Sequence, residues 1–360
     1  MKKIVGTIAA IALAASSAFA GVNVGMGFNR GFFVPFAYDG TDAKAGLSTS
    51  WGAEPRVGVS FSAASEQVGV VADVKFDGGN VAVNDNAYIW VKPVEWFKMN
   101  IGQSFDDTLR GNACFGSWDW LRPADIILGE DLIFTRVCQN PLGGAYAPLQ
   151  GAILMLDPIE GLHISVGLPT GYGIAANWED LISYTQVQAG YTIADVAQIK
   201  AQWIGKGKNA DDELEGQFEV AASVKAIEGM TLDVGAKFRT VEDAPIDVAV
   251  FWGMPVAGLA LNANALVSIP TADNADMSLA IGAGVGYDLG NGMGVGADVR
   301  YSQTFDDVTD PAIAFAAWFD KGIANGTLGV AVQGATKTTI RDIAASDFSF
   351  AVPVRVQCFF

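Results

Sequence analysis

Basic residues, histidine and cysteine are all scarce in this sequence. Its 360 residues include 22 lysines and arginines against 39 acidic residues, one histidine and three cysteines. A net charge of −17, with no basic stripe, excludes a nucleic-acid partner. A single histidine leaves little scope for a catalytic base, and the cysteines lack the CxxC spacing of a metal site. We therefore expect neither an enzyme nor a cofactor or metal centre.

Long hydrophobic runs are also missing after residue 20, although 51% of the residues are hydrophobic and the mean hydropathy is +0.29. A helix that crosses a membrane needs about 18 or more apolar residues in a row, and the rest of the chain has no such run. The apolar residues must therefore be distributed along the chain, as they are in strands that alternate between an apolar and a polar face.

Residues 1–20 have the pattern of a cleaved export signal. Two lysines precede an apolar stretch over residues 4–15, and residues 18–20 have the small-x-small order of a cleavage site. A cytosolic amphipathic helix, the alternative, does not explain this order. Cleavage between Ala20 and Gly21 removes both lysines and changes the net charge from −17 to −19.

Apolar and polar residues alternate over several segments of about ten residues. The C-terminal segment is the clearest, because its apolar positions are separated by residues that include Ser349, Arg355 and Gln357. Its apolar positions are Phe348, Phe350, Val352, Val354, Val356, Cys358 and Phe360. Residues 230–239 and 293–302 show the same two faces. Successive side chains of a strand point to opposite faces, so each segment predicts a two-faced strand.

Short turns and longer polar connections alternate along residues 21–360, which we predict to form one domain. The turns lie near residues 93, 158, 195, 229, 255 and 291, and longer polar segments such as 206–213, 270–276 and 304–310 lie between them. Turns at one rim and longer loops at the other are typical of outer-membrane barrels, in which every backbone group pairs inside lipid. We therefore predict an all-β fold: one closed antiparallel transmembrane β-barrel of about 18 strands, or about 16 as the alternative, with periplasmic termini.

The signal peptide, the alternating strands and the terminal Phe360 resemble those of the bacterial outer-membrane porin superfamily. The resemblance covers the whole mature chain in architecture. Pro353 departs from the usual last strand, and the acidic, Gly-containing loop motif of the trimeric general porins has no close match. The resemblance implies a water-filled channel for small polar solutes and ions in the outer membrane of a diderm bacterium. It also implies three kinds of partner: outer-membrane lipids, the barrel-assembly machinery that would read Phe360, and further copies in a homotrimer.

One connection, residues 104–148, is much longer than the others. It has about 45 residues, and loops of this length without regular structure are usually functional. The resemblance implies that this segment, the third outer loop, folds inward and constricts the channel. Its two tryptophans and the apolar Ile126–Leu128 stretch agree with burial, whereas the alternative is an outward surface loop. Cys114 and Cys138 lie in this loop, and the oxidising periplasm permits a disulfide between them.

Charged residues predict how such a channel would act on solutes. The alternation places basic residues on the inner wall, and those assigned to the pore lining are Arg56, Lys75, Lys237, Arg239, Arg300 and Arg355. The loop contributes Asp119, Asp125, Glu130 and Asp131 together with Arg110, Arg122 and Arg136. An acidic loop opposite a basic wall creates a transverse field in a narrow passage, which aligns polar solutes. The alternative is that these charges only keep the interior hydrated.

Glycines recur at alternate inner-face positions of two predicted strands, at residues 282, 284 and 286 and at residues 294 and 296. A phosphate-binding loop must lie at the start of a helix, so glycines within strands instead suit strand bending or the close approach of another segment.

Two other functions fit a barrel: a plugged or narrow barrel acting as a surface structural protein or adhesin, and a transporter of hydrophobic substrates. The transporter would need an N-terminal plug, whereas residues 21–38 already have a strand pattern.

Overall fold

The computed structural model describes residues 22–26, 29–44, 57–77, 80–109, 121–123, 126–129, 148–171, 177–224, 226–340, 343 and 345–358. These residues form 20 strands and one short helix, α3 (Trp178–Ser183). No helix in this part of the chain is long and apolar enough to cross a membrane.

The strands are β1 (Val22–Met26), β2 (Asn29–Tyr38), β3 (Ala43–Lys44), β4 (Val57–Ala64), β5 (Val68–Asp77), β6 (Asn80–Val94), β7 (Phe97–Ser104), β8 (Leu149–Ile159), β9 (Leu162–Leu168), β10 (Gln186–Ile193), β11 (Ala197–Lys208), β12 (Leu214–Val224), β13 (Thr231–Arg239), β14 (Ile246–Val256), β15 (Leu259–Ile269), β16 (Ser278–Gly290), β17 (Met293–Thr304), β18 (Ala312–Ile323), β19 (Gly326–Thr336) and β20 (Ser349–Cys358).

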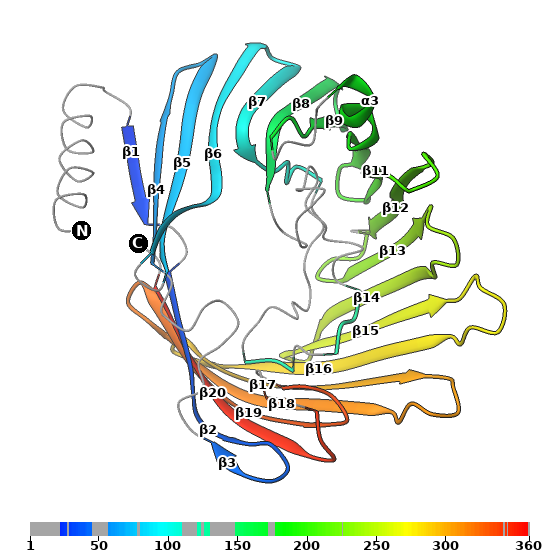
Figure 1. Cartoon of the computed structure of the whole chain (residues 1–360). Coiled ribbons are helices and arrows are strands. Elements are labelled where there is room, and N and C mark those ends of the chain that lie inside the picture. The colour runs from blue at the N-terminus through cyan, green and yellow to red at the C-terminus, as the bar shows by residue number, and fades with distance from the viewer. Residues whose placement is uncertain are drawn as a thin grey trace.

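These strands belong to one antiparallel sheet that curls round on itself (Figure 1). From β4 to β20 each strand pairs with the next along the chain, and β2 pairs with β20. Tight turns join the strands at one end, for example through Ala257 and Gly258 between β14 and β15 and through Asn291 between β16 and β17, all at positive φ. Longer connections, such as residues 270–277 and 305–311, join them at the other end. The predicted rhythm of turns and longer connections is therefore present in the fold.

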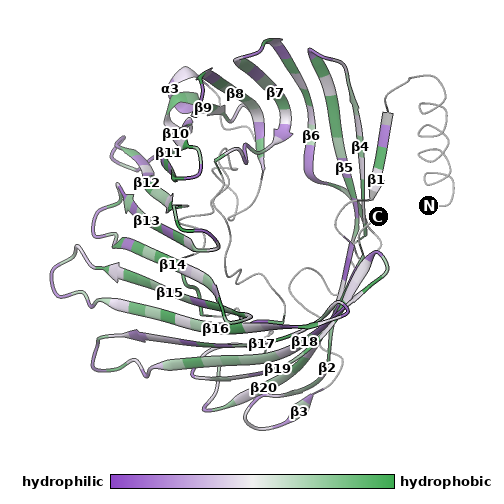
Figure 2. Cartoon of the chain, turned by 180° about the vertical axis from the view of Figure 1, so that it is seen from behind, coloured by the Kyte–Doolittle hydropathy of each residue, from purple (hydrophilic) through white to green (hydrophobic). Residues whose placement is uncertain are grey.

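The two faces of the sheet have the opposite polarity to those of a soluble protein. On β17, Val299 is 49% exposed whereas the adjacent Arg300 is 1% exposed. On β13, Phe238 is exposed and the adjacent Lys237 is buried. Figure 2 shows hydrophobic and hydrophilic residues alternating along the strands. An apolar outer face around a polar interior suits lipid and not water.

The structure corrects both the predicted strand number and the predicted closure. The described strands number 20 instead of about 18, because the short strands β1 and β3 join the sheet with five and two residues. The sheet is not closed, and β1 and β3 are its ends. The reason is that β1 pairs with β4 while β2 pairs with β20, so β2 and β4 form no ladder within the described residues. These two strands meet where the Gly58 amide donates a hydrogen bond to Asn29 Oδ1 at 2.8 Å.

Candidate pore constriction

The described parts of the long connection lie against the inner face of the sheet. Leu109, Leu121, Ile126 and Leu128 are each no more than 3% exposed, although they belong to no strand or helix. The last three share an apolar cluster with inward residues of β14, β16 and β18 to β20. Ile127, between two buried residues, is 62% exposed. The connection therefore presents alternating buried and exposed side chains where it covers the inner face.

Glycines on three strands accept the buried leucines of the connection. A Cβ atom on Gly329 of β19 would clash with Leu121, one on Gly282 of β16 with Leu128, and one on Gly190 of β10 with Leu109. Each leucine thus occupies the space that the side chain of any residue larger than glycine would fill at that strand position. For Gly282 this confirms the expected close approach of another segment to the inner glycines. We call these three contacts the glycine sockets.

Arg122 binds the same part of the connection to the wall through its charge. Its guanidinium donates two hydrogen bonds to the Asp298 carboxylate of β17, from Nε to Oδ2 at 2.5 Å and from Nη2 to Oδ1 at 2.8 Å. The guanidinium also lies 5.3 Å from the centroid of the Trp318 ring, and the Arg122 carbonyl accepts a hydrogen bond from Gln333 Nε2 at 3.1 Å. Both charged groups are almost fully buried. A buried bidentate pair favours one geometry, because leaving either charge unpaired is costly.

Two basic residues predicted to line the pore are buried beneath other groups. Arg300 is 1% exposed, and its Nη1 donates to the carbonyl of Ile126 at 2.9 Å. Lys237 is 7% exposed, with its Nζ 3.8 Å from Asp247 Oδ2. Arg239, which is less buried, donates to the same carboxylate at 2.7 Å. Arg300 thus binds the long connection, whereas Lys237 and Arg239 pair with Asp247 within the wall.

The connection between β19 and β20 also turns inward, which the sequence pattern did not predict. Ile340 and Ile343 are joined by two backbone hydrogen bonds of 3.2 and 2.9 Å and are 1% and 3% exposed. They belong to the same apolar cluster as Leu121, together with inward residues such as Val34 and Ala335. The signal that could have revealed this turn is the pair of isoleucines three residues apart in an otherwise polar connection.

His163 of β9 joins the start of the long connection to the wall. Its Nε2 lies 2.8 Å from Asp106 Oδ2, and its Nδ1 lies 2.7 Å from Asp157 Oδ1 of β8. Because ionised carboxylates only accept hydrogen bonds, both contacts are hydrogen bonds at once when the imidazole is protonated. Burial raises the pKa of Asp106, but hydrogen bonds from His163 and Thr108 lower it by more than burial raises it. The resulting pKa is about 2. Sequence alone does not connect His163 with Asp106, because 57 positions separate them.

Replacing His163 with alanine should loosen the start of the long connection. The buried Asp106 would keep its hydrogen bonds with Thr108 but lose the one with the imidazole, at a cost of about 1–3 kcal/mol.

Acid should have a related effect on the unmodified protein. Because folding lowers the pKa of Asp106 from 3.8 to about 2, its contribution is present above pH 3.8 and is lost as the pH falls through about 2. Hydrogen exchange of residues 105–109 measures both effects. Glu160→Ala, in the neighbouring exposed turn, is the control, and equal exchange in the two variants would contradict the assignment.

Burial divides the inner face into a covered part and an open part. Polar inward residues of β10 and β11, such as Gln186 and Lys200, are buried. Asp73 and Lys75 of β5 and Tyr88 of β6 are only half-buried. The polar inner face of β5 and β6 is therefore one part of the described wall that remains accessible to water.

The predicted site residues have different outcomes. Those outside the described residues are Ala20, Gly21, Arg56, Arg110, Cys114, Asp119, Asp125, Glu130, Asp131, Cys138, Arg136 and Phe360.

Arg355 lies on the inner face, where its Nη2 donates to Asp320 Oδ1 at 2.6 Å, while Val356 is exposed on the other face. The loop–wall ion pair formed by Arg122 and Asp298 has the opposite sense to the predicted acidic loop on a basic wall. The described residues contain no group of three or more His, Cys, Asp or Glu that could hold a metal ion.

Comparisons with known proteins agree with this architecture. No protein-family model matches the sequence, and no curated protein matches it. An anion-selective porin from Comamonas acidovorans has a similar structure, with 10% identity and a TM-score of 0.51 over 94% of this chain and 100% of that chain. A variant of the Rh. blastica porin matches with 12% identity and a TM-score of 0.51 over 94% and 100% of the two chains. OmpT of Vibrio cholerae, in a trimer form, matches at 12% identity and a TM-score of 0.47 over 94% and 99%. At these identities the likeness concerns the fold, and the chain has the fold of an outer-membrane porin.

Proposed function

We propose that the protein is an outer-membrane porin that lets small polar solutes and ions diffuse passively through a water-filled passage narrowed by residues 104–148. The observation that carries this proposal is the docking of the long connection onto the inner face through the glycine sockets. A segment held inside the curl, without a strand of its own in the described residues, reduces the free cross-section of the interior.

The passage would run between the docked connection and the accessible polar face of β5 and β6. Asp73 accepts a hydrogen bond from Asn86 Nδ2 at 2.6 Å on this face, and Lys75 lies two residues further along β5. Charges on the wall of a narrow passage act strongly on solutes, because little water separates them. The loop acids Asp119, Asp125, Glu130 and Asp131 would complete a field across the passage.

The same proposal includes three kinds of partner and a protein that is not an enzyme. The apolar outer face would contact outer-membrane lipids, Phe360 would be read by the assembly machinery, and the protein would form homotrimers. Catalysis by His163 is disfavoured by its geometry, because both ring nitrogens face carboxylates and neither faces a hydroxyl nucleophile.

A plugged surface barrel is the second candidate, and a specific observation favours it. Two connections fold inward and share one apolar cluster, which would fill part of the interior. A transporter of hydrophobic substrates is less well supported, because residues 22–26 and 29–38 are strands β1 and β2 and not a plug. Refolded protein in a planar bilayer separates the candidates. A porin gives discrete, ohmic conductance steps in KCl, whereas a plugged barrel gives none.

Neutralising Lys75 should shift the ion selectivity towards cations, and Arg56→Gln should add to the shift. The reason is that Lys75 lies on the accessible part of the inner face, where its charge acts on passing ions. Lys237→Gln is the matched control, since Lys237 is buried beside Asp247. Reversal potentials in a salt gradient measure the effect. Equal shifts in Lys75→Gln and Lys237→Gln would contradict the proposed course of the passage.

A further inference from the structure

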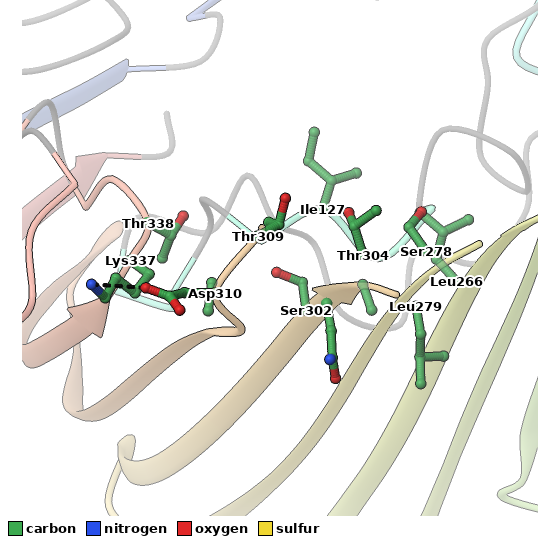
Figure 3. Close-up of a pocket in the computed structure, with 13 residues that line it drawn as sticks. Ile127, Leu266, Ser278, Leu279, Ser302, Thr304, Thr309, Asp310, Lys337 and Thr338 are labelled. Atoms are coloured by element: carbon green, nitrogen blue, oxygen red, sulfur yellow. Dashed lines mark ion pairs between the residues drawn. The ribbon is translucent and has the colours of Figure 1, made fainter. Parts of the chain in front are cut away.

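A pocket of about 340 Å³ lies where β16 begins and β17 ends, at the rim with the longer connections (Figure 3). Its lining also includes Thr309 from the connection before β18, Thr338 from the connection after β19 and Ile127 from the long connection. The pocket therefore opens beside the docked constriction segment. Its volume is within the range of about 300–1,000 Å³ in which small-molecule sites are found.

Hydroxyl groups form much of the polar lining of this pocket. Ser278 pairs in register with Thr304, and Ser302 lies two residues before Thr304 on the same face. Thr309 and Thr338 add hydroxyls from the two connections. Within the described part of the chain, the hydroxyls of Ser278, Ser302 and Thr304 have no hydrogen-bond partner in the protein. Each can therefore both donate to and accept from a bound solute.

The two charged residues that line the pocket, Lys337 and Asp310, pair with each other, and Lys337 also pairs with Asp347 outside the lining. Lys337 Nζ lies 3.0 Å from Asp310 Oδ2 and 2.6 Å from Asp347 Oδ1. Hydrogen bonds with Asp347 and Asp310 raise the pKa of Lys337, so the ammonium stays charged and paired at neutral pH. An anionic solute would have to compete with two carboxylates, and a cationic solute would have to compete with the lysine. An uncharged solute avoids both costs.

Apolar side chains form the remaining lining. Ala280 and Ala312 are 7% and 8% exposed, Leu266 pairs with Ala280, and Ile127 is 62% exposed. Sugars and polyols carry C–H faces bordered by hydroxyl groups. A lining that combines small apolar surfaces with hydroxyls able to donate and accept matches both parts of such a molecule.

We propose that this pocket is a binding subsite for an uncharged polyhydroxyl solute, a sugar or a polyol, at the mouth of the passage. The proposal rests on the porin function and adds a substrate class to it. Three hydroxyls contributed by two adjacent strands, Ser278, Ser302 and Thr304, would hold the solute next to the entrance of the constriction.

Titration of single channels with maltotriose in KCl tests the subsite. Transient, saturable current blocks are expected in the unmodified protein. In Ser278→Ala/Ser302→Ala/Thr304→Val the apparent affinity should fall about tenfold or more, because three uncharged hydrogen bonds are lost. The KCl conductance should not change, since no charge is altered. Ser60→Ala/Ser62→Ala on β4 removes two hydroxyls from another part of the sheet and should leave the blocks as they were.

The possible outcomes separate the subsite from the porin function. Conductance steps without saturable blocks, or equal losses of affinity in the triple variant and the β4 control, would overturn the subsite alone. Block by inorganic phosphate but not by maltotriose would also overturn it, because the ligand would then be an anion. Absence of KCl conductance would overturn the porin function itself.

Discussion

Gly282→Val/Gly329→Val should raise the single-channel conductance roughly twofold or more, because the long connection would be displaced from the inner wall. At Gly329 a new Cβ would meet Leu121 and the Asp320 carboxylate, and at Gly282 it would meet Leu128 and the Asn264 amide. All of these neighbours are side chains, so the strands themselves can keep their pairing. Valine is also favoured in strands. The cost of the substitution therefore falls on the docked leucines and on two wall side chains, Asn264 and Asp320, and not on the strand pairing.

Gly286→Val/Gly294→Val is the matched control for this experiment. Gly286 is on β16 and Gly294 is on β17. A Cβ atom would meet its nearest neighbour at 3.7 Å on Gly286 and at 3.8 Å on Gly294, which is ordinary van der Waals contact. The control should conduct like the unmodified protein. Deleting the core of residues 104–148 should also raise the conductance. If neither the socket variant nor the deletion conducts more than the control, the connection does not set the narrowest point.

Asp298→Asn should detach the Arg122 part of the connection, with a loss of about 3–5 kcal/mol in docking free energy. The buried guanidinium would lose its carboxylate, and the Trp318 ring that it also contacts cannot balance a full charge. We expect large, noisy fluctuations of the channel current and faster tryptic cleavage within residues 104–148. Asp276→Asn removes an exposed carboxylate and controls for the change in net charge.

A double-mutant cycle distinguishes a lost ion pair from a general loss of stability. Arg122→Met alone leaves Asp298 buried without its partner, whereas Arg122→Met/Asp298→Asn removes both charges. The double variant should therefore be less destabilised than the sum of the two single variants. Strict additivity would show that the pair does not hold the connection in place.

The regular part of the fold was predictable because its signal is local. Alternation over residues 293–302 predicts that Val299 and Arg300 lie on opposite faces of one strand, and the structure agrees. The turn near residue 291 was equally visible, since asparagine flanked by glycines readily adopts positive φ. Each of these predictions depends only on a residue and its sequence neighbours.

The ends of the sheet and the constriction contacts were not predictable in this way. Whether β1 takes the edge of β4 depends on two segments whose sequences show no preference for each other. Arg122 and Asp298 are 176 positions apart, and alternation within either segment gives no information about the other. Arg300 looked like a pore-lining charge, because alternation gives the face of a residue but not what covers that face.

The sequence by itself determined the class of the fold: two-faced strands and a polar interior follow from composition and period-two patterning. Tertiary structure alone decided which inner residues remain in contact with water. Lys75 and Lys237 have the same chemistry and the same predicted face, yet one is half-buried on β5 and the other is buried beside Asp247. The physical reason is that burial depends on segments distant in sequence. The long connection covers one part of the wall because leucines meet glycines there, and it leaves another part open.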